Sequence, residues 1–172
     1  MTRRPGARRP ASGRRLEAPI DLRCCVALPR PLRALLVEAA AAATPRGRRW
    51  SLVVVGDRRM RRLNREFHAT DETTDVLAFP LDRLDGDEHA VDGEVIVCAP
   101  YARREARSRG LQFGTELALY AVHGILHLLG EDDHAPAAAR RMRVRERAIL
   151  AKVGVALPRG HLDELKFPAP RA

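Results

Sequence analysis

Three histidines between His123 and His134 have the spacing of metal ligands. His123 and His127 are four residues apart in an apolar run, so in a helix their side chains lie on one face. Gly130 is a natural helix stop, because glycine adopts the left-handed conformation without penalty, and the chain can then bring His134 back. Three neutral imidazoles with an open fourth position are typical of a catalytic zinc site, where bound water can ionise near neutral pH. We therefore predict that His123, His127 and His134 bind one Zn²⁺ per chain.

The helix predicted from Thr115 to Leu129 is otherwise apolar, so its polar residues are informative. Glu116, Tyr120, His123 and His127 step by four, three and four residues, which places them in one narrow stripe. Burying four polar side chains costs several kcal/mol unless they are paired, bind an ion or line a wet cleft. The stripe therefore favours a metal site or a cleft along this helix.

Two acidic residues, Asp132 and Asp133, directly precede the proposed third ligand. A carboxylate beside a metal-binding imidazole can orient its N–H group, and Asp133 is our candidate for a catalytic carboxylate. The alternative is that both are exposed loop acids, which is the usual place for aspartate.

The other segments predict the elements that position this helix. Hydrophobic patterning, proline and glycine divide the chain into strands at 20–27, 50–55, 74–80 and 94–98 and helices at 31–44, 57–67, 99–110, 115–129 and 136–154. Four short strands cannot form a barrel or sandwich, so the expected fold class is α+β (α/β-like): a small mixed four-stranded sheet packed with about five helices, and the metal site on a central helix. The first strand is expected near an edge, and Asp57 and Thr115 are expected to cap their helices.

Basic residues concentrate at the N-terminus and in one helix. The chain has 31 Lys and Arg against 22 Asp and Glu, but six of these arginines lie in residues 1–15, which contain no acid. We expect a disordered basic arm at 1–16, a single domain at 17–157 and a loose tail at 158–172. The arm either contacts a polyanion or is a solubilising tail. Five further arginines in the second helix form either a surface for an RNA phosphate backbone or a solvated face: Arg58, Arg59, Arg61, Arg62 and Arg65.

Features of other protein classes are missing from the sequence. No apolar segment follows the N-terminal arginines, and no stretch approaches the roughly 20 apolar residues of a membrane helix. The three cysteines are an odd number without C-x-x-C spacing, which fits a reducing compartment. We expect a soluble cytoplasmic protein with no membrane partner and no organic cofactor.

Three segments resemble a known family. HGILHLLGEDDH, with LNREFHATDETTDVLAFP and DGEVIV upstream, is similar to the YbeY-type bacterial rRNA maturation factors over roughly residues 50–150. The resemblance implies a mixed sheet and a zinc site at His123, His127 and His134. It also implies a metal-dependent endoribonuclease for single-stranded RNA, acting in 16S rRNA 3′-end maturation and ribosome quality control. The implied partners are rRNA or the small ribosomal subunit, with ribosomal or assembly-factor proteins.

The chain departs from the family pattern at several points. The loop from the second to the third histidine is one residue longer, but one residue adds about 3.3 Å of reach, so His134 is expected to remain a ligand. His68 stands where the family usually has an arginine. It either contacts a phosphate, when protonated or as a hydrogen-bond donor, or takes part in proton transfer, and it is a candidate catalytic residue. Ala78 replaces a common serine, and the basic arm has no family counterpart.

Two other functions share features of this sequence. Metalloproteases of the metzincin type also have two helical histidines four apart and a third downstream, but they need a glutamate after the first histidine, and this chain has Gly124. The second alternative is a non-catalytic, ribosome-associated RNA-binding assembly factor with a structural metal. The sequence leaves this alternative open.

Overall fold

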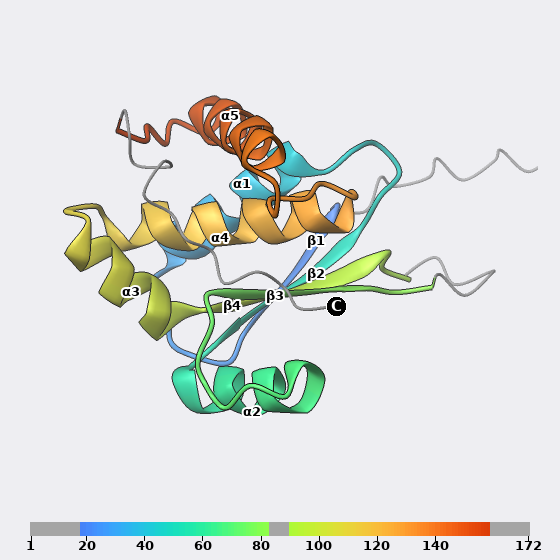
Figure 1. The fold of residues 1–172 in the computed structure, drawn as a ribbon. Coiled ribbons are helices and arrows are strands. Elements are labelled where there is room, and N and C mark those ends of the chain that lie inside the picture. Colours follow the sequence, from blue (N-terminus) through green and yellow to red (C-terminus); the bar gives the residue numbers. More distant parts are fainter. Residues whose placement is uncertain (1–17, 83–89, 159–172) are drawn as a thin grey trace, which may run out of the picture.

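The computed structural model describes residues 18–82 and 90–158, which form one sheet and five helices (Figure 1). The strands are β1 (Ile20–Cys24), β2 (Trp50–Val55), β3 (Val76–Pro80) and β4 (Gly93–Cys98). The helices are α1 (Arg30–Ala43), α2 (Asp57–His68), α3 (Ala99–Ser108), α4 (Phe113–Leu128) and α5 (Pro136–Lys152). The predicted α+β class is confirmed. The predicted basic arm and nearly all of the predicted C-terminal tail lie outside the described residues.

The sheet is mixed, with the strand order β1-β2-β4-β3. β1, β2 and β4 are parallel, while β3 pairs with β4 in the antiparallel direction, from Val76 opposite Val97 to Pro80 opposite Gly93. The expected edge position of the first strand is confirmed, and β3 forms the other edge. The site described below lies beside β3.

Side chains alternate between the two faces of the sheet, and each face has its own core. Ile96 and Cys98 of β4 pack with Met60 of α2 on one face. Val95 and Val97 face the larger core on the other side, to which α1, α4 and α5 contribute. In Figure 1, α2 lies below the sheet and α4 lies above it. The sheet therefore separates α2 from the histidine-bearing helix.

Two predicted helix caps are wrong. The cap of α2 is Gly56, and the Asp57 carboxylate instead accepts hydrogen bonds of 2.8 and 3.0 Å from the Arg104 guanidinium. Gln112 precedes the first residue of α4, so Thr115 lies inside the first turn, where its N–H donates to the Gln112 carbonyl at 3.0 Å. The Asp57 carboxylate therefore makes an ion pair with α3, and α2 has no side-chain cap.

Among the described helices, none is long and apolar enough to cross a membrane.

Candidate metal centre

His123 and His127 point their Nε2 atoms at each other from successive turns of α4. The two nitrogens are 2.9 Å apart, and the rings meet edge to face at 89°. His123 is 2% exposed, so it has little access to bulk water. The predicted pairing of these residues on one helix face is confirmed.

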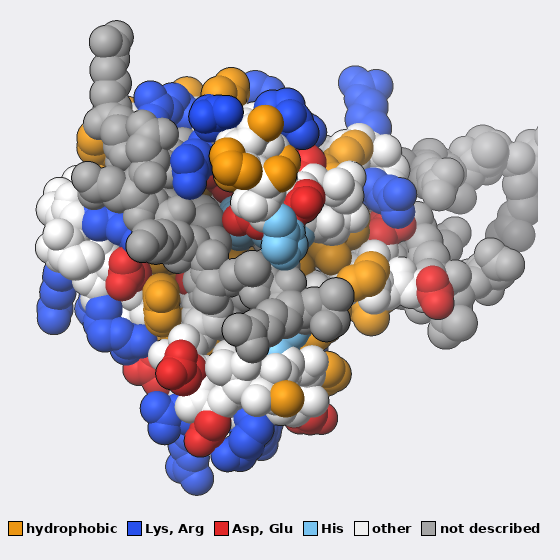
Figure 2. All heavy atoms as spheres, in the orientation of Figure 1, with side chains coloured by type: hydrophobic (Ala, Val, Ile, Leu, Met, Phe, Trp, Pro, Cys, Tyr) orange, Lys and Arg blue, Asp and Glu red, His pale blue; other side chains and the backbone are white. Residues whose placement is uncertain are grey.

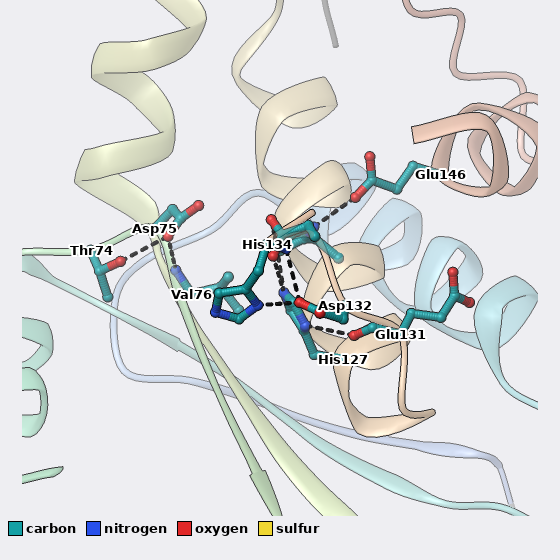
Figure 3. A network of polar contacts seen from close by, with 10 residues as sticks. Thr74, Asp75, Val76, His127, Glu131, Asp132, His134 and Glu146 are labelled. Atoms are coloured by element: carbon teal, nitrogen blue, oxygen red, sulfur yellow. Dashed lines mark hydrogen bonds and ion pairs between the residues drawn. The ribbon is translucent and has the colours of Figure 1, made fainter. Parts of the chain in front are cut away.

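The outer nitrogen of each ring has a hydrogen-bond acceptor. His123 Nδ1 donates to Glu146 Oε1 of α5 at 2.7 Å, and His127 Nδ1 donates to the Glu131 carbonyl at 3.0 Å. A proton on each Nδ1 leaves a lone pair on each Nε2, so two lone pairs face each other. Such a pair suits a shared cation, and hydrogen bonds of this kind orient metal-binding histidines. In Figure 3, Glu146 lies above Glu131, and a dashed line joins His127 to Glu131.

Sequence reasoning missed Glu146. It is fully buried and lies in α5 on the inward side with Met142, Ile149 and Leu150, where a carboxylate needs a partner. The available indication was an acidic residue four positions after Met142 on an otherwise apolar helix side.

The surrounding charges act differently on the two imidazoles. Burial lowers the pKa of His123, but the hydrogen bond and charge of Glu146, with smaller contributions from Asp75 and Asp133, outweigh burial and raise it. Burial, together with the neighbouring His123, lowers the pKa of His127. Asp75 is itself buried, which raises the pKa of its carboxyl group although it accepts hydrogen bonds from Thr74 Oγ1 and the Val76 N–H. The site therefore gathers buried acidic groups around two imidazoles.

Asp133 completes the group around the two histidines. One carboxylate oxygen lies 3.9 Å from His123 Nε2 and the other lies 3.8 Å from His127 Nε2. Within the described part of the chain, Asp133 Oδ1 is buried and has no hydrogen-bond donor. Ligand atoms of all three residues lie within 4.8 Å of one another. Two imidazole nitrogens and an unsatisfied carboxylate oxygen are a donor set that fits a metal ion.

His134 lies beside this group. Its side chain is 51% exposed, and Nδ1 contacts the Asp132 carboxylate, so the expected contact between a neighbouring acid and this imidazole is present with Asp132 (Figure 3). Asp132, Asp133 and His134 form a second possible ligand group, which shares Asp133 with the first. The structure thus places Asp133 with the helix histidines. The ligand role of His134 and the catalytic role of Asp133 stay predictions.

Gly130 ends the helix and turns the chain, as predicted. Its φ is +84°, its N–H donates to the His127 carbonyl at 2.9 Å, and the next N–H, of Glu131, donates to the Leu126 carbonyl at 3.0 Å. This pattern satisfies helix carbonyls while reversing the chain. The turn places the Glu131 carbonyl where His127 needs its acceptor.

The polar stripe of α4 divides into two parts. Glu116 is fully buried and pairs with Arg109 at 3.1 Å, while Tyr120 packs edge-on against Tyr101. Burial, and secondarily the charge of Glu116, raises the pKa of Tyr120. The first half of the stripe is therefore anchored by a buried ion pair, and the second half carries the histidines.

Gly124 packs against the sheet. A Cβ atom at this position would lie 2.6 Å from Val95 Cγ1 and 2.9 Å from Val76 Cγ2. The glutamate that a metzincin carries after its first histidine has no room here, and it would point into the sheet. The structure therefore agrees with the sequence argument against a metalloprotease.

The comparisons with known proteins agree on one family. The model of the family described as endoribonuclease YbeY matches residues 31–154. This chain belongs to the endoribonuclease YbeY family. It is 45% identical over 141 residues to an endoribonuclease YbeY of Anaeromyxobacter dehalogenans strain 2CP-C, covering 78% of this chain and 72% of the relative. It is 38% identical over 125 residues to that of Halorhodospira halophila, covering 71% and 81%.

A solved structure supports the fold of this YbeY-family member. The solution structure of TM1509 from Thermotoga maritima superposes with a TM-score of 0.55 and 27% sequence identity, covering 78% of this chain and 88% of the other.

The predicted RNA-binding arginines lie away from the metal centre. All five are exposed on α2, on the far face of the sheet from α4. His68, the last residue of α2, is half-buried, and neither group of possible metal ligands in the described residues includes it. In Figure 2, basic side chains gather at the bottom over α2 and also at the top over α5. The sequence did not lead us to expect a basic surface on α5. Its Arg145 forms an ion pair with Glu131, whose carbonyl contacts His127.

We expect Asp133→Ala to weaken metal binding by at least about tenfold, because it removes a carboxylate from the histidine pair. Titration of metal-free protein with Zn²⁺ measures the effect, and an unchanged affinity would contradict this placement. His134→Ala is the companion variant. An equal or larger loss with His134→Ala would show that this imidazole also completes the metal site.

Proposed function

We propose that this protein is a zinc-dependent endoribonuclease that cuts single-stranded RNA in the cytoplasm. Its proposed substrate is the 3′ end of 16S rRNA during small-subunit maturation, with a further role in ribosome quality control. Family membership supports RNA cleavage. The structural observation that supports a metal is the pair of imidazoles whose Nε2 atoms converge while both Nδ1 atoms have acceptors.

The donor set favours zinc. Imidazole nitrogens with a carboxylate oxygen are ordinary zinc ligands, whereas magnesium and calcium prefer oxygen ligands alone. We propose His123 and His127 as ligands, with Asp133 or His134 as the third. When bound, zinc supplies Lewis-acid stabilisation of phosphate charge and acidifies bound water.

The protein's own residues prepare the site for this chemistry. Glu146 and the Glu131 carbonyl hold the two imidazoles in the tautomer that presents Nε2. Gly130 fixes the turn that supplies this carbonyl, and the buried flank of α4 limits access of water to His123. Binding energy is therefore not spent on ordering the histidines when a metal and a phosphate arrive.

The arginines of α2 are proposed to hold the RNA backbone. Each phosphate contact on a single strand contributes about 0.7 to the slope of log affinity against log salt concentration. We expect the double variant Arg58→Gln/Arg62→Gln to flatten this slope by about 1 to 1.5. Fluorescence anisotropy with unstructured RNA over a salt series measures the slope. Arg46→Gln, in the loop after α1, is the matched control, and an equal effect of this control would remove the case for α2.

The central test is an end-mapped cleavage assay on small-subunit rRNA precursor with metal content recorded. We expect wild-type protein containing zinc to cut unpaired RNA near the mature 3′ end, and chelation followed by zinc addition to abolish and restore cutting. Binding of the precursor without any cleavage in the zinc-loaded protein would instead favour a non-catalytic assembly factor.

A further inference from the structure

Phe67 is an exposed aromatic side chain with a defined position. Three large apolar side chains are exposed in the described ranges, and Phe67, at 54%, is the aromatic one among them. Its ring packs against Phe79 of β3, with the ring centroids 4.8 Å apart and the planes tilted by 54°. Phe79 therefore holds the ring in place while more than half of the residue's surface remains open to solvent.

This aromatic pair lies level with the metal centre, across the edge strand. Phe79 is opposite Glu94 in the β3–β4 pairing, and Glu94 directly follows Gly93 in β4. Leu128, which follows His127, covers Gly93 from the other face, because a Cβ on Gly93 would lie 2.8 Å from Leu128 Cδ1. Phe67 and His127 thus lie near the same end of the sheet, on opposite faces, with β3 forming the edge between them.

The surroundings of Phe67 match the chemistry of a nucleic-acid strand. The same helix carries five exposed arginines, of which Arg65 is paired with Asp71 and Arg59 contacts Cys25. Proteins that bind single strands combine a positively charged surface, which follows the phosphates, with aromatic rings on which bases stack. An exposed ring beside these arginines supplies both parts.

We infer that Phe67 stacks on a nucleobase of single-stranded RNA, and that the strand crosses the β3 edge from α2 to the metal centre. This inference rests on the proposed function, because it takes RNA as the substrate. It adds a base-contacting residue to the phosphate contacts and explains how arginines on one face of the sheet serve a metal site on the other.

The test compares RNA with and without bases. Two labelled oligoribonucleotides of equal length, oligoadenylate and its abasic counterpart, are titrated with wild type, Phe67→Ala and Phe67→Leu over a salt series. Stacking contributes about 1–3 kcal/mol per base, so we expect Phe67→Ala to weaken oligoadenylate binding by about 5- to 150-fold. The salt slope and the affinity for the abasic strand should stay unchanged, because the phosphate contacts remain.

Phe67→Leu and a control variant separate stacking from folding. Phe67→Leu keeps an apolar contact with Phe79 but lacks an aromatic face, so it should lose nearly as much affinity as Phe67→Ala while keeping the wild-type unfolding midpoint. Val144→Ala, at an apolar residue 69% exposed on α5, should bind like wild type.

Each remaining outcome counts against the inference. Unchanged oligoadenylate binding by both Phe67 variants, with wild type binding and cleaving RNA, overturns stacking and leaves the proposed function intact. Equal losses on both probes also overturn stacking and indicate a general effect on the fold or on the phosphate contacts. A wild type that neither binds nor cleaves RNA overturns both proposals.

Discussion

His127→Ala is expected to lose both the bound metal and RNA cleavage. The substitution removes one of the two converging imidazole nitrogens, so the proposed ligand set loses a nitrogen donor beside His123. Metal stabilisation of a reacting phosphate contributes several kcal/mol, so cleavage should fall by at least about 100-fold. Metal analysis and single-turnover cleavage of unstructured RNA measure the two losses.

Glu146→Gln provides a graded comparison. It keeps a hydrogen-bond acceptor for His123 but removes the negative charge, so metal affinity should fall by about 10- to 100-fold. Excess zinc should then restore most of the cleavage in Glu146→Gln but none in His127→Ala. Full cleavage by metal-free His127→Ala, folded as judged by circular dichroism, would refute the metal centre.

Gly124→Ala is expected to destabilise the protein although it places a better helix former inside a helix. At an unobstructed helix position this change stabilises by about 0.5–1 kcal/mol. Here the new Cβ would lie 2.6 Å from Val95 Cγ1 and 2.9 Å from Val76 Cγ2. Overpacking of this kind costs about 1–3 kcal/mol, so the free energy of unfolding should fall. Urea denaturation of metal-free protein measures the change.

Gly114→Ala is the matched control on the same helix. Its added Cβ would meet the side-chain ends of Leu32 at 3.1 Å and Leu35 at 3.4 Å, which can move. Its effect should stay below about 1 kcal/mol. Adding Val95→Ala to Gly124→Ala should cost less than the two single changes together. Val95→Ala removes the two Cγ methyl groups that the new Cβ of residue 124 would meet. A stabilised Gly124→Ala protein would show that α4 is not pressed against the sheet.

Local patterns in the sequence predicted most helices and strands, because the apolar side chains of each element repeat within a few residues. The four-residue step from His123 to His127 and the glycine stop at Gly130 depend on neighbours within one or two turns, and both are confirmed. The caps predicted at Asp57 and Thr115 are wrong, because the Asp57 carboxylate pairs with Arg104 and α4 begins two residues before Thr115. Asp57 binds Arg104, which is 47 residues away.

Local sequence patterns were enough to predict the family, the α+β class and the helix on which His123 and His127 share one face. The surroundings of these two imidazoles depend on tertiary packing. Glu146 reaches His123 because α5 packs on α4, and the loop after Gly130 brings Asp133 beside the histidines. Packing also places the arginines of α2 behind the sheet. These features depend on which faces of distant elements pack together. The repeat of side chains within one helix or strand does not specify its packing partner.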